Sequence, residues 1–189
     1  SGMSLREAFA SYRFWLMFVS ILAVAFAYGG AHIHMPSIIT GHGFSREQAA
    51  QVMSLLGLSI LGGRVITGFL LDRFWAPAVV LPILSLPAIS CVLLAGDGLT
   101  LPVAMLAAWL LGFAAGAESD LIAYLAGRYF GMRHYGKIYG MLYMPFGIAS
   151  AISPTVYGAV RDTTGSYDPI LYVAGTCFLF GAVILLGLG

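Results

Sequence analysis

The sequence predicts an all-α membrane protein of six transmembrane helices, and three observations support this fold class. Hydrophobic residues make up 60% of the 189 residues, charged residues only 9%, and the mean hydropathy is +0.91. An ordinary soluble domain carries about 25% charged residues. The apolar residues also gather into six runs of about 20 residues, which is the length that a helix needs to cross a bilayer. Lipid is therefore the predicted surrounding of the chain.

Short polar gaps separate the six apolar runs. The gaps are rich in Gly, Pro, Asp and basic residues, as in GHGFSRE and RDTTGSYD, which is typical of connections between helices. No gap is long enough to join two domains, so we expect one six-helix bundle over residues 1–189. The expected spans cover roughly residues 14–38, 49–71, 77–96, 101–126, 138–160 and 169–189.

Net charge and cysteine use exclude several other classes of protein. The net charge is +1 and the pI is about 7.8, which provides no basic surface for nucleic acid. Cys91 and Cys177 stand alone in apolar runs, with no CxxC pair and no histidine at ligand spacing. We therefore expect no disulfide, metal or cofactor. We also find no cleavable signal pattern, and the apolar end at Gly189 suggests a fragment boundary.

Basic residues are unevenly distributed between the two sets of gaps, and this predicts the orientation of the chain. Lysine and arginine accumulate on the cytoplasmic side of membrane proteins. One set of gaps and flanks holds six basic residues and the other set holds two. The six are Arg6, Arg13, Arg73, Arg128, Arg133 and Lys137, and the two are Arg46 and Arg161. We therefore expect both termini in the cytoplasm and the chain in a plasma membrane, the inner membrane of a bacterium.

A faint internal repeat relates the first three spans to the last three. Residues 68–72 and 158–162 both run from Gly to Asp and lie 90 positions apart. Residues 30–32 and 116–118 both begin with Gly-Ala and lie 86 positions apart. Because an odd number of spans separates the copies, the second copy is expected to be inverted in the membrane.

Two motifs carry a resemblance to a known family. The run Gly63-Arg64-Val-Ile-Thr-Gly68-Phe-Leu-Leu-Asp72-Arg73 resembles the G-x-x-x-D-R motif of the major facilitator superfamily. Residues 116–120, 124–131 and 135–136 are similar to the tenth helix and the following loop of its monocarboxylate and oxalate/formate antiporter branch. The resemblance implies helices 7 to 12 of a full transporter, which is half of the fold and contains two inverted three-helix repeats.

Three ionisable side chains are expected at bilayer depth, where each is a functional candidate because a charge there costs at least about 2.5–3.5 kcal/mol. They are Arg64, Glu118 and Asp120. Arg64 and Glu118 lie at similar depth, about 15 and 17 residues into their spans. In the oxalate/formate relatives an arginine of helix 8 binds the substrate carboxylate, so the resemblance implies that role for Arg64. The alternative is that Arg64 balances the charge of one of the two acidic residues.

Glu118 and Asp120 are expected to have different roles. Two positions along a helix are separated by about 200°, so the two carboxyl groups cannot face one cavity. Asp120 falls on a stripe with Gly112 and Gly116, which suggests close helix contact, so we place it with the structural and gating residues. Glu118 is then the candidate for proton coupling, because burial favours the uncharged form of a carboxyl group.

His32, His34 and Tyr143 complete the expected substrate site. The histidines lie beside Gly29–Gly30 and before Pro36, where a break in the helix is expected. They point apart and make a poor metal pair, and a water-bound residue at the mouth of a pore is an equal alternative. Tyr143 follows Tyr135 and Tyr139 at steps of four, as a cavity or interface aromatic.

Charges at the cytoplasmic helix ends form the last group of candidates. The resemblance implies that Asp72, Arg73 and Arg128 form a charge lock that closes the inner face, with Asp72 and Arg128 as the preferred pair. Ordinary loop charges at helix ends are the alternative reading.

The sequence thus favours the C-terminal half of a secondary active transporter that moves a small organic anion by alternating access, with possible proton coupling. A monocarboxylate fits better than a dicarboxylate, because the central lysine of helix 11 in the oxalate/formate relatives has only Lys137, at the start of its span, as a counterpart. The expected partners are lipid and either an N-terminal six-helix half or a second copy in a homodimer. An exporter of drugs or other solutes, or a half that acts only in folding and assembly, are the alternatives. An enzyme is not expected, since no GxSG protease motif is present.

Overall fold

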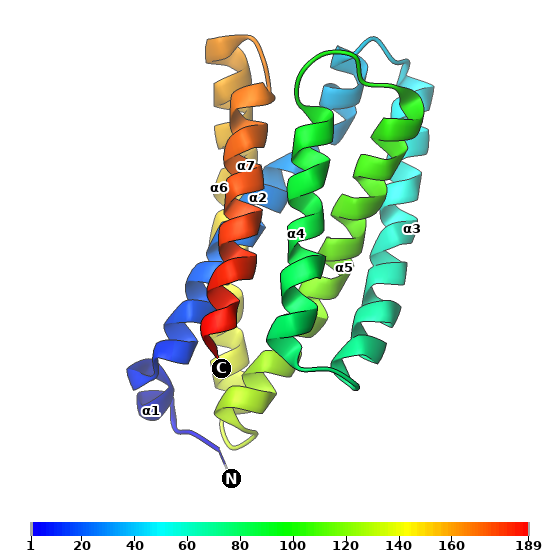
Figure 1. The fold of residues 1–189 in the computed structure, drawn as a ribbon. Coiled ribbons are helices and arrows are strands. Elements are labelled where there is room, and N and C mark those ends of the chain that lie inside the picture. Colours follow the sequence, from blue (N-terminus) through cyan, green and yellow to red (C-terminus); the bar gives the residue numbers. More distant parts are fainter. Residues whose placement is uncertain (1, 189) are drawn as a thin grey trace.

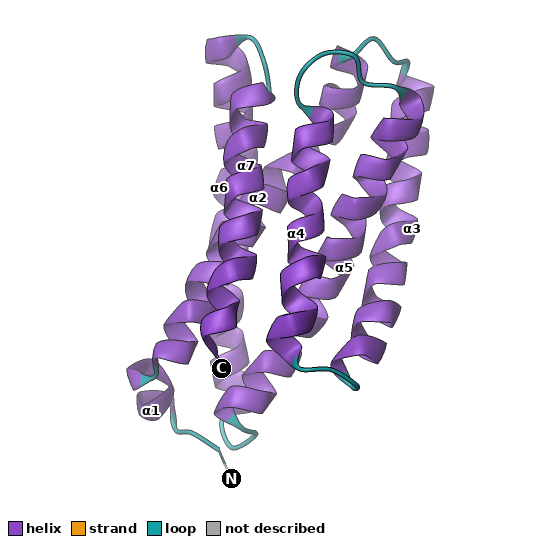
Figure 2. Cartoon of the chain, viewed as in Figure 1, coloured by secondary structure: helices purple, strands orange, loops and turns teal. Residues whose placement is uncertain are grey.

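Residues 2–188 are described by the computed structural model, and within this range they form helices and loops without a β-strand (Figures 1 and 2). The ends of the chain lie toward the same end of the bundle, which is the lower end in Figure 1. A short 3-10 turn, Leu185–Leu188, continues the last helix. The helices are α1 (Leu5–Ala10), α2 (Tyr12–Gly41), α3 (Arg46–Leu71), α4 (Ala76–Leu94), α5 (Leu101–Phe130), α6 (Tyr135–Thr164) and α7 (Asp168–Ile184).

Local sequence signals set the ends of these helices. Ser45 and Gln48 form a capping box that satisfies free N–H groups at the start of α3. Proline stands in the first turn of α4, α5 and α7, where its missing N–H costs no hydrogen bond. Gly131 and Gly165 end α5 and α6 with φ values of 77° and 79°, which other residues rarely adopt. The expected gaps are therefore tight turns.

Five helical segments are long and apolar enough to cross a membrane: α2, α3, α4, α5 and the segment Asp168–Leu188. The expected span 138–160 lies in α6, which has 30 residues. Because its composition is more polar, α6 is not among these five segments. α6 nevertheless runs alongside α2 for most of its length (Figure 1). Its polar residues, described below, bond to α2.

The helices pair in a pattern that repeats. α2 packs chiefly on α6, and α5 packs chiefly on α3, while α4 and α7 pack on each other and on α5 and α2 respectively. Exchanging α2–α3–α4 with α5–α6–α7 maps every one of these contacts onto another. α2 and α5 run in opposite directions (Figure 1). The predicted fold class, two inverted three-helix repeats, is confirmed.

Glycines bring the backbones of α3 and α5 into direct contact. A Cβ atom on Gly116 would collide with the carbonyl oxygen of Ile60, and one on Gly63 would collide with that of Phe113. Gly112 likewise lies against Leu56 and Ser59. The two helices run in the same direction, and their close contacts join each position of α3 to positions of α5 that lie 50–56 residues later. This register places the polar residues of both helices.

Substitution of Gly116 by alanine should destabilise the bundle. The added methyl group has no space unless α3 and α5 separate, and overpacking of this kind costs about 1–3 kcal/mol. The apparent melting temperature of the chain in detergent measures the effect. Gly57→Ala is the matched control, because a Cβ there meets no atom within 4 Å. Equal melting temperatures for the two variants would contradict the proposed backbone contact.

Candidate functional site

Arg64 lies on α3, seven positions before the lower end of that helix, and its side chain is exposed. It follows directly after Gly63, which touches α5. The register of α3 against α5 brings Arg64 level with residues 114–120 of α5. This segment ends at Asp120, whose side chain is half-buried. The fold thus brings a guanidinium and a carboxylate to the same level of two packed helices.

Arg64 and Asp120 do not form a salt bridge in this structure. Within residues 2–188 no lysine or arginine nitrogen lies within 4.0 Å of a carboxylate oxygen. Arg64 therefore has its fork of donors available to an incoming acceptor. An anion is the ligand that such a group recognises best.

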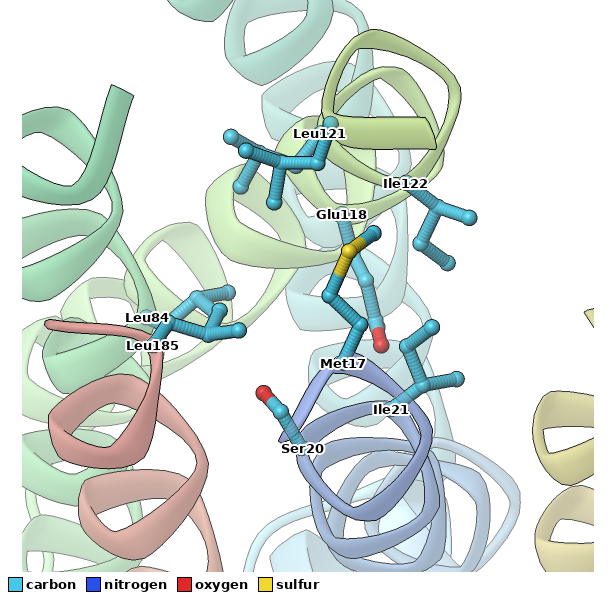
Figure 3. A pocket seen from close by; sticks show the side chains of 9 residues that line it. Met17, Ser20, Ile21, Leu84, Glu118, Leu121, Ile122 and Leu185 are labelled. Atoms are coloured by element: carbon cyan, nitrogen blue, oxygen red, sulfur yellow. The ribbon is translucent and has the colours of Figure 1, made fainter. Parts of the chain in front are cut away.

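Glu118 has a different environment from that of Arg64, although the two lie at similar depth. Its side chain is 5% exposed, and it points toward α2 between Met17 and Ile21 (Figure 3). Oε1 of this carboxyl group has no hydrogen-bond partner. Arg64 and Glu118 therefore do not face one site, because Arg64 is on the surface and Glu118 is inside the bundle.

A small cavity adjoins the Glu118 carboxyl group. Its volume is about 20 Å³, which is sufficient for one water molecule. Ser20 is the polar neighbour, but its hydroxyl already donates to the carbonyl oxygen of Gly181 at 2.8 Å. The rest of the lining consists of Met17, Ile21, Leu84, Leu121, Ile122, Leu125 and Leu185. Such a site tolerates a neutral carboxyl group far better than a carboxylate.

The two histidines on α2 have different contacts. His32 is half-buried and stacks on Tyr28, with ring centroids 5.4 Å apart, and its Nδ1 has no partner. His34 has both ring nitrogens engaged: Nε2 lies 2.8 Å from the carbonyl oxygen of Pro154, and Nδ1 lies 2.9 Å from the hydroxyl of Tyr167. Nδ1 of His32 is thus unpartnered, but it is buried and not open to a ligand in this state. The geometry of His34 favours a positioning role instead.

Tyr143 belongs to a row of aromatic rings along α6. Tyr135, Tyr139, Tyr143 and Phe146 follow one another with centroid separations of 5.7, 5.8 and 5.0 Å. Tyr135 donates to the carbonyl oxygen of Ala123 on α5, so the row begins against α5. Tyr143 is 39% exposed and is available to a partner or a ligand.

The residues of the expected charge lock lie at the lower end of the bundle. Asp72, Arg73 and Arg128 are all exposed. The register of α3 on α5 brings Asp72 level with residues 122–128, a segment that ends at Arg128. Arg73, however, packs its guanidinium over the ring of Phe69 at 4.3 Å, and no ion pair forms in residues 2–188. The three charges are gathered at one end but are not locked together.

Two clefts open between neighbouring helices, and the internal repeat relates them. One lies at the upper end between α2 and α3, has a volume of about 580 Å³ and includes Pro36 and Arg46. The other lies at the lower end between α5 and α6, has a volume of about 620 Å³ and includes Tyr124 and Arg128. Each repeat thus opens a cleft toward one side of the bundle.

Sequence reasoning missed the polar residues that join α6 to α2. Ser153 and Tyr157 hydrogen-bond to the backbone of α2. Spacing alone gives no sign of this role, because serine and tyrosine are common in membrane helices. The repeat offers a signal, since Ser153 corresponds to Gly63 at the 90-residue offset.

Inverted repeats, clefts at opposite ends and isolated ionisable groups inside the bundle together define the class of a membrane transporter unit. The sequence matches the family profile described as Major Facilitator Superfamily over residues 2–154. The chain belongs to this superfamily, and this membership places it among transporters and not among enzymes.

Individual relatives refine the comparison. Monocarboxylate transporter 12 of Mus musculus is 26% identical over 184 residues, covering 91% of this chain and 36% of the relative. Monocarboxylate transporter 9 of Gallus gallus is 30% identical over 139 residues, covering 71% of this chain and 27% of the relative. The expected resemblance to the monocarboxylate branch is confirmed, and the chain spans about a third of the length of these relatives.

A solved structure shows the same fold. The E. coli fucose:proton symporter FucP superimposes with a TM-score of 0.76 at 14% identity, over 98% of this chain and 46% of that chain. The fold of the chain is therefore about half of a complete transporter of this superfamily.

Replacement of Glu118 by methionine should stabilise the chain. The carboxyl group is buried without a partner for Oε1, and an unsatisfied buried polar group costs about 1–3 kcal/mol, whereas methionine fits the apolar lining. Thermal melting in detergent measures the gain, with Ser20→Ala as a control that removes a satisfied hydroxyl and should lower the melting temperature. A loss of stability in Glu118→Met would contradict this account of the cavity.

Proposed function

We propose that this chain is the C-terminal half of a secondary transporter that moves a small monocarboxylate by alternating access. The observation that carries the proposal is Arg64, an exposed and unpaired guanidinium on α3 within the membrane-spanning part of the fold. A charge at that depth is costly unless it serves a ligand or a partner. The similarity to two monocarboxylate transporters supports a carboxylate as that ligand.

Asp120 serves as the resting partner of Arg64 in this proposal. Asp120 lies at the end of the α5 segment, residues 114–120, that is level with Arg64, and movement of the two side chains brings their charges together. An incoming carboxylate then replaces Asp120 at the guanidinium, so the energy of one ion pair is exchanged for that of another. Such an exchange keeps binding reversible, which transport requires because a tightly held substrate is not released.

One arginine suits a substrate with one carboxylate. The next basic residue along the path, Lys137, is exposed at the start of α6 near the lower end. The remainder of the substrate contacts the half-buried ring of His32 and the exposed ring of Tyr143. His34 holds the upper part of α2 in place for these contacts.

Glu118 is the proposed proton site. Its apolar pocket holds the neutral form, and ionisation would favour an arrangement that admits water between α2 and α5. Protons carried in this way accompany an anionic substrate and compensate its charge.

The lower end of the bundle faces the cytoplasm in this proposal, so both termini are cytoplasmic and the membrane is a plasma membrane. Asp72 pairs with Arg128 when the inner face closes, and Arg73 supports that lock. An N-terminal six-helix half or a second copy supplies the opposite wall of the transport path. The unpaired charges at the lower end are consistent with a state in which this lock is open.

Arg64→Lys should weaken binding of monocarboxylates by about 10–100-fold, because lysine keeps the charge but loses the bidentate fork, and a charge-assisted bond is worth about 1.5–3 kcal/mol. Thermal stabilisation of the chain by a panel of mono- and dicarboxylates measures binding, and uptake into liposomes measures transport. Arg133→Ala is the control, as an exposed arginine in the loop between α5 and α6. Unchanged carboxylate binding in Arg64→Lys and Arg64→Ala would refute the anion site.

Asp120→Asn should tighten carboxylate binding while slowing release. The variant removes the internal competitor for Arg64 and keeps the shape of the side chain. Dissociation rates of a radiolabelled monocarboxylate distinguish this outcome from simple loss of structure. Weaker binding in Asp120→Asn would show that Asp120 contributes to the site in another way.

Glu118→Gln should abolish the pH dependence of uptake. Glutamine fills the same volume but cannot release a proton, so a pH gradient no longer drives accumulation. Exchange of substrate at equal pH on both sides should persist. Uptake by Glu118→Gln that still follows the pH gradient would remove Glu118 from the coupling mechanism.

A further inference from the structure

The two interlocked helix pairs of the repeat are joined by different chemistry. α3 and α5 meet chiefly through glycines and backbone atoms around Gly63 and Gly116, with the hydroxyl of Ser59 against Gly112. At the equivalent position of the other pair, Ser153 of α6 takes the place of Gly63. Its hydroxyl accepts a hydrogen bond from the N–H of Gly30 at 2.9 Å and donates one to the carbonyl oxygen of Phe26.

Phe26 and Gly30 are the two partners of a single helical hydrogen bond, since an α-helix joins each N–H to the carbonyl four residues earlier. The Ser153 hydroxyl bridges both. A side chain inserted at this point of the ladder is one of the recognised causes of a bend in a helix. One turn further along α6, Tyr157 donates to the carbonyl oxygen of Ala27 at 2.6 Å. Three backbone groups of α2, the carbonyls of Phe26 and Ala27 and the N–H of Gly30, thus have a partner on α6.

Both helices of this pair also have interrupted ladders of their own. Pro36 lies inside α2 and Pro145 and Pro154 lie inside α6, and each removes one backbone donor. α3 contains no proline, and α5 has one only in its first turn. Gly29 and Gly30 add conformational freedom to α2 at the bridged turn. The features that permit bending are therefore concentrated in one helix pair.

We propose that α3 and α5 move as a rigid block, whereas α2 bends at Phe26–Gly30, with the Ser153 hydroxyl as the clamp that holds the turn. When the clamp holds, the serine supports both backbone groups. When it is absent, the N–H of Gly30 and the carbonyl of Phe26 have only their own helical bond, and the turn opens more readily.

Bending at this turn changes the upper cleft. Residues 31–41 of α2 follow the turn, and Pro36, Ser37 and Thr40 form one wall of the cleft between α2 and α3. The bonds of His34 to Pro154 and Tyr167 tie this part of α2 to α6 and to the loop after it. The segment therefore moves with the upper end of α6, while α3, the opposite wall, stays with α5. Ser153 is a positioning residue for this movement.

Hydrogen–deuterium exchange of the 189-residue chain in lipid nanodiscs tests the proposal without any substrate. Ser153→Ala removes both bonds and should increase exchange in the peptides that cover residues 24–34 by at least about tenfold, with peptides from α3 and α5 unchanged. Tyr157→Phe, which removes only the bond to Ala27, should produce a smaller increase in the same peptides. Ser153→Thr, which restores a hydroxyl, should return exchange toward that of the original chain.

Ser90→Ala is the matched control. Ser90 is equally buried and donates to the carbonyl oxygen of Ala107 at 2.7 Å, which joins α4 to α5 without entering a helical turn. Its loss should leave residues 24–34 unchanged. The proposal is overturned if Ser153→Ala leaves exchange of α2 unaltered, or if it raises exchange equally in α2, α3 and α5. Because the readout is exchange and not transport, failure of the carboxylate proposal leaves this test intact.

Discussion

The contact between the backbones of α3 and α5 is the constraint on which the arrangement of charges depends. Because Gly116 meets the carbonyl of Ile60 and Gly63 meets that of Phe113, neither helix can slide or rotate against the other without collision. Soluble helix bundles fix such a register with large interdigitating side chains, whereas small residues fix it in membranes. The fixed register brings Arg64 level with residues 114–120 of α5 and Asp72 level with residues 122–128. The proposed substrate site and the proposed lock therefore both depend on the glycine contacts between these two helices.

In the second helix pair, α2 and α6, hydrogen bonds fix the contact between the two helices. Ser153 stands where the first pair has Gly63, and Tyr157 stands where it has Thr67. A hydroxyl bound to a backbone carbonyl can change its partner at little cost, but two backbones in van der Waals contact have no alternative arrangement. The two equivalent helix pairs of the inverted repeat thus have different mechanical properties. The α3–α5 pair is stiff, and the α2–α6 pair is pliable.

Much of this fold could be predicted from composition, run lengths and the faint repeat. The offset of 86 residues matched Gly30 with Gly116, and both positions are points of helix contact. Depth in the membrane also followed from counting residues. The direction in which a side chain points could not be predicted by counting residues, since it depends on which face of the helix meets a neighbour. Arg64 and Glu118 were therefore given similar depth, while the contacts of α5 with α2 that bury Glu118 could not be seen in the sequence.

The burial of Glu118 also limits how a proton there can affect transport. Its carboxyl group contacts Met17 and Ile21 of α2 and not the face that carries Arg64, so its charge cannot act on a bound anion by direct contact. Ser20, the polar neighbour, is already bonded to Gly181, so an ionised carboxyl group has no donor within the cavity to replace water. An ionised Glu118 can therefore reach water only if α2 and α5 separate where Met17 and Ile21 lie beside it. In the proposed mechanism, proton binding is then coupled to the substrate through the position of α2, the helix for which we propose a bend beside Ser153.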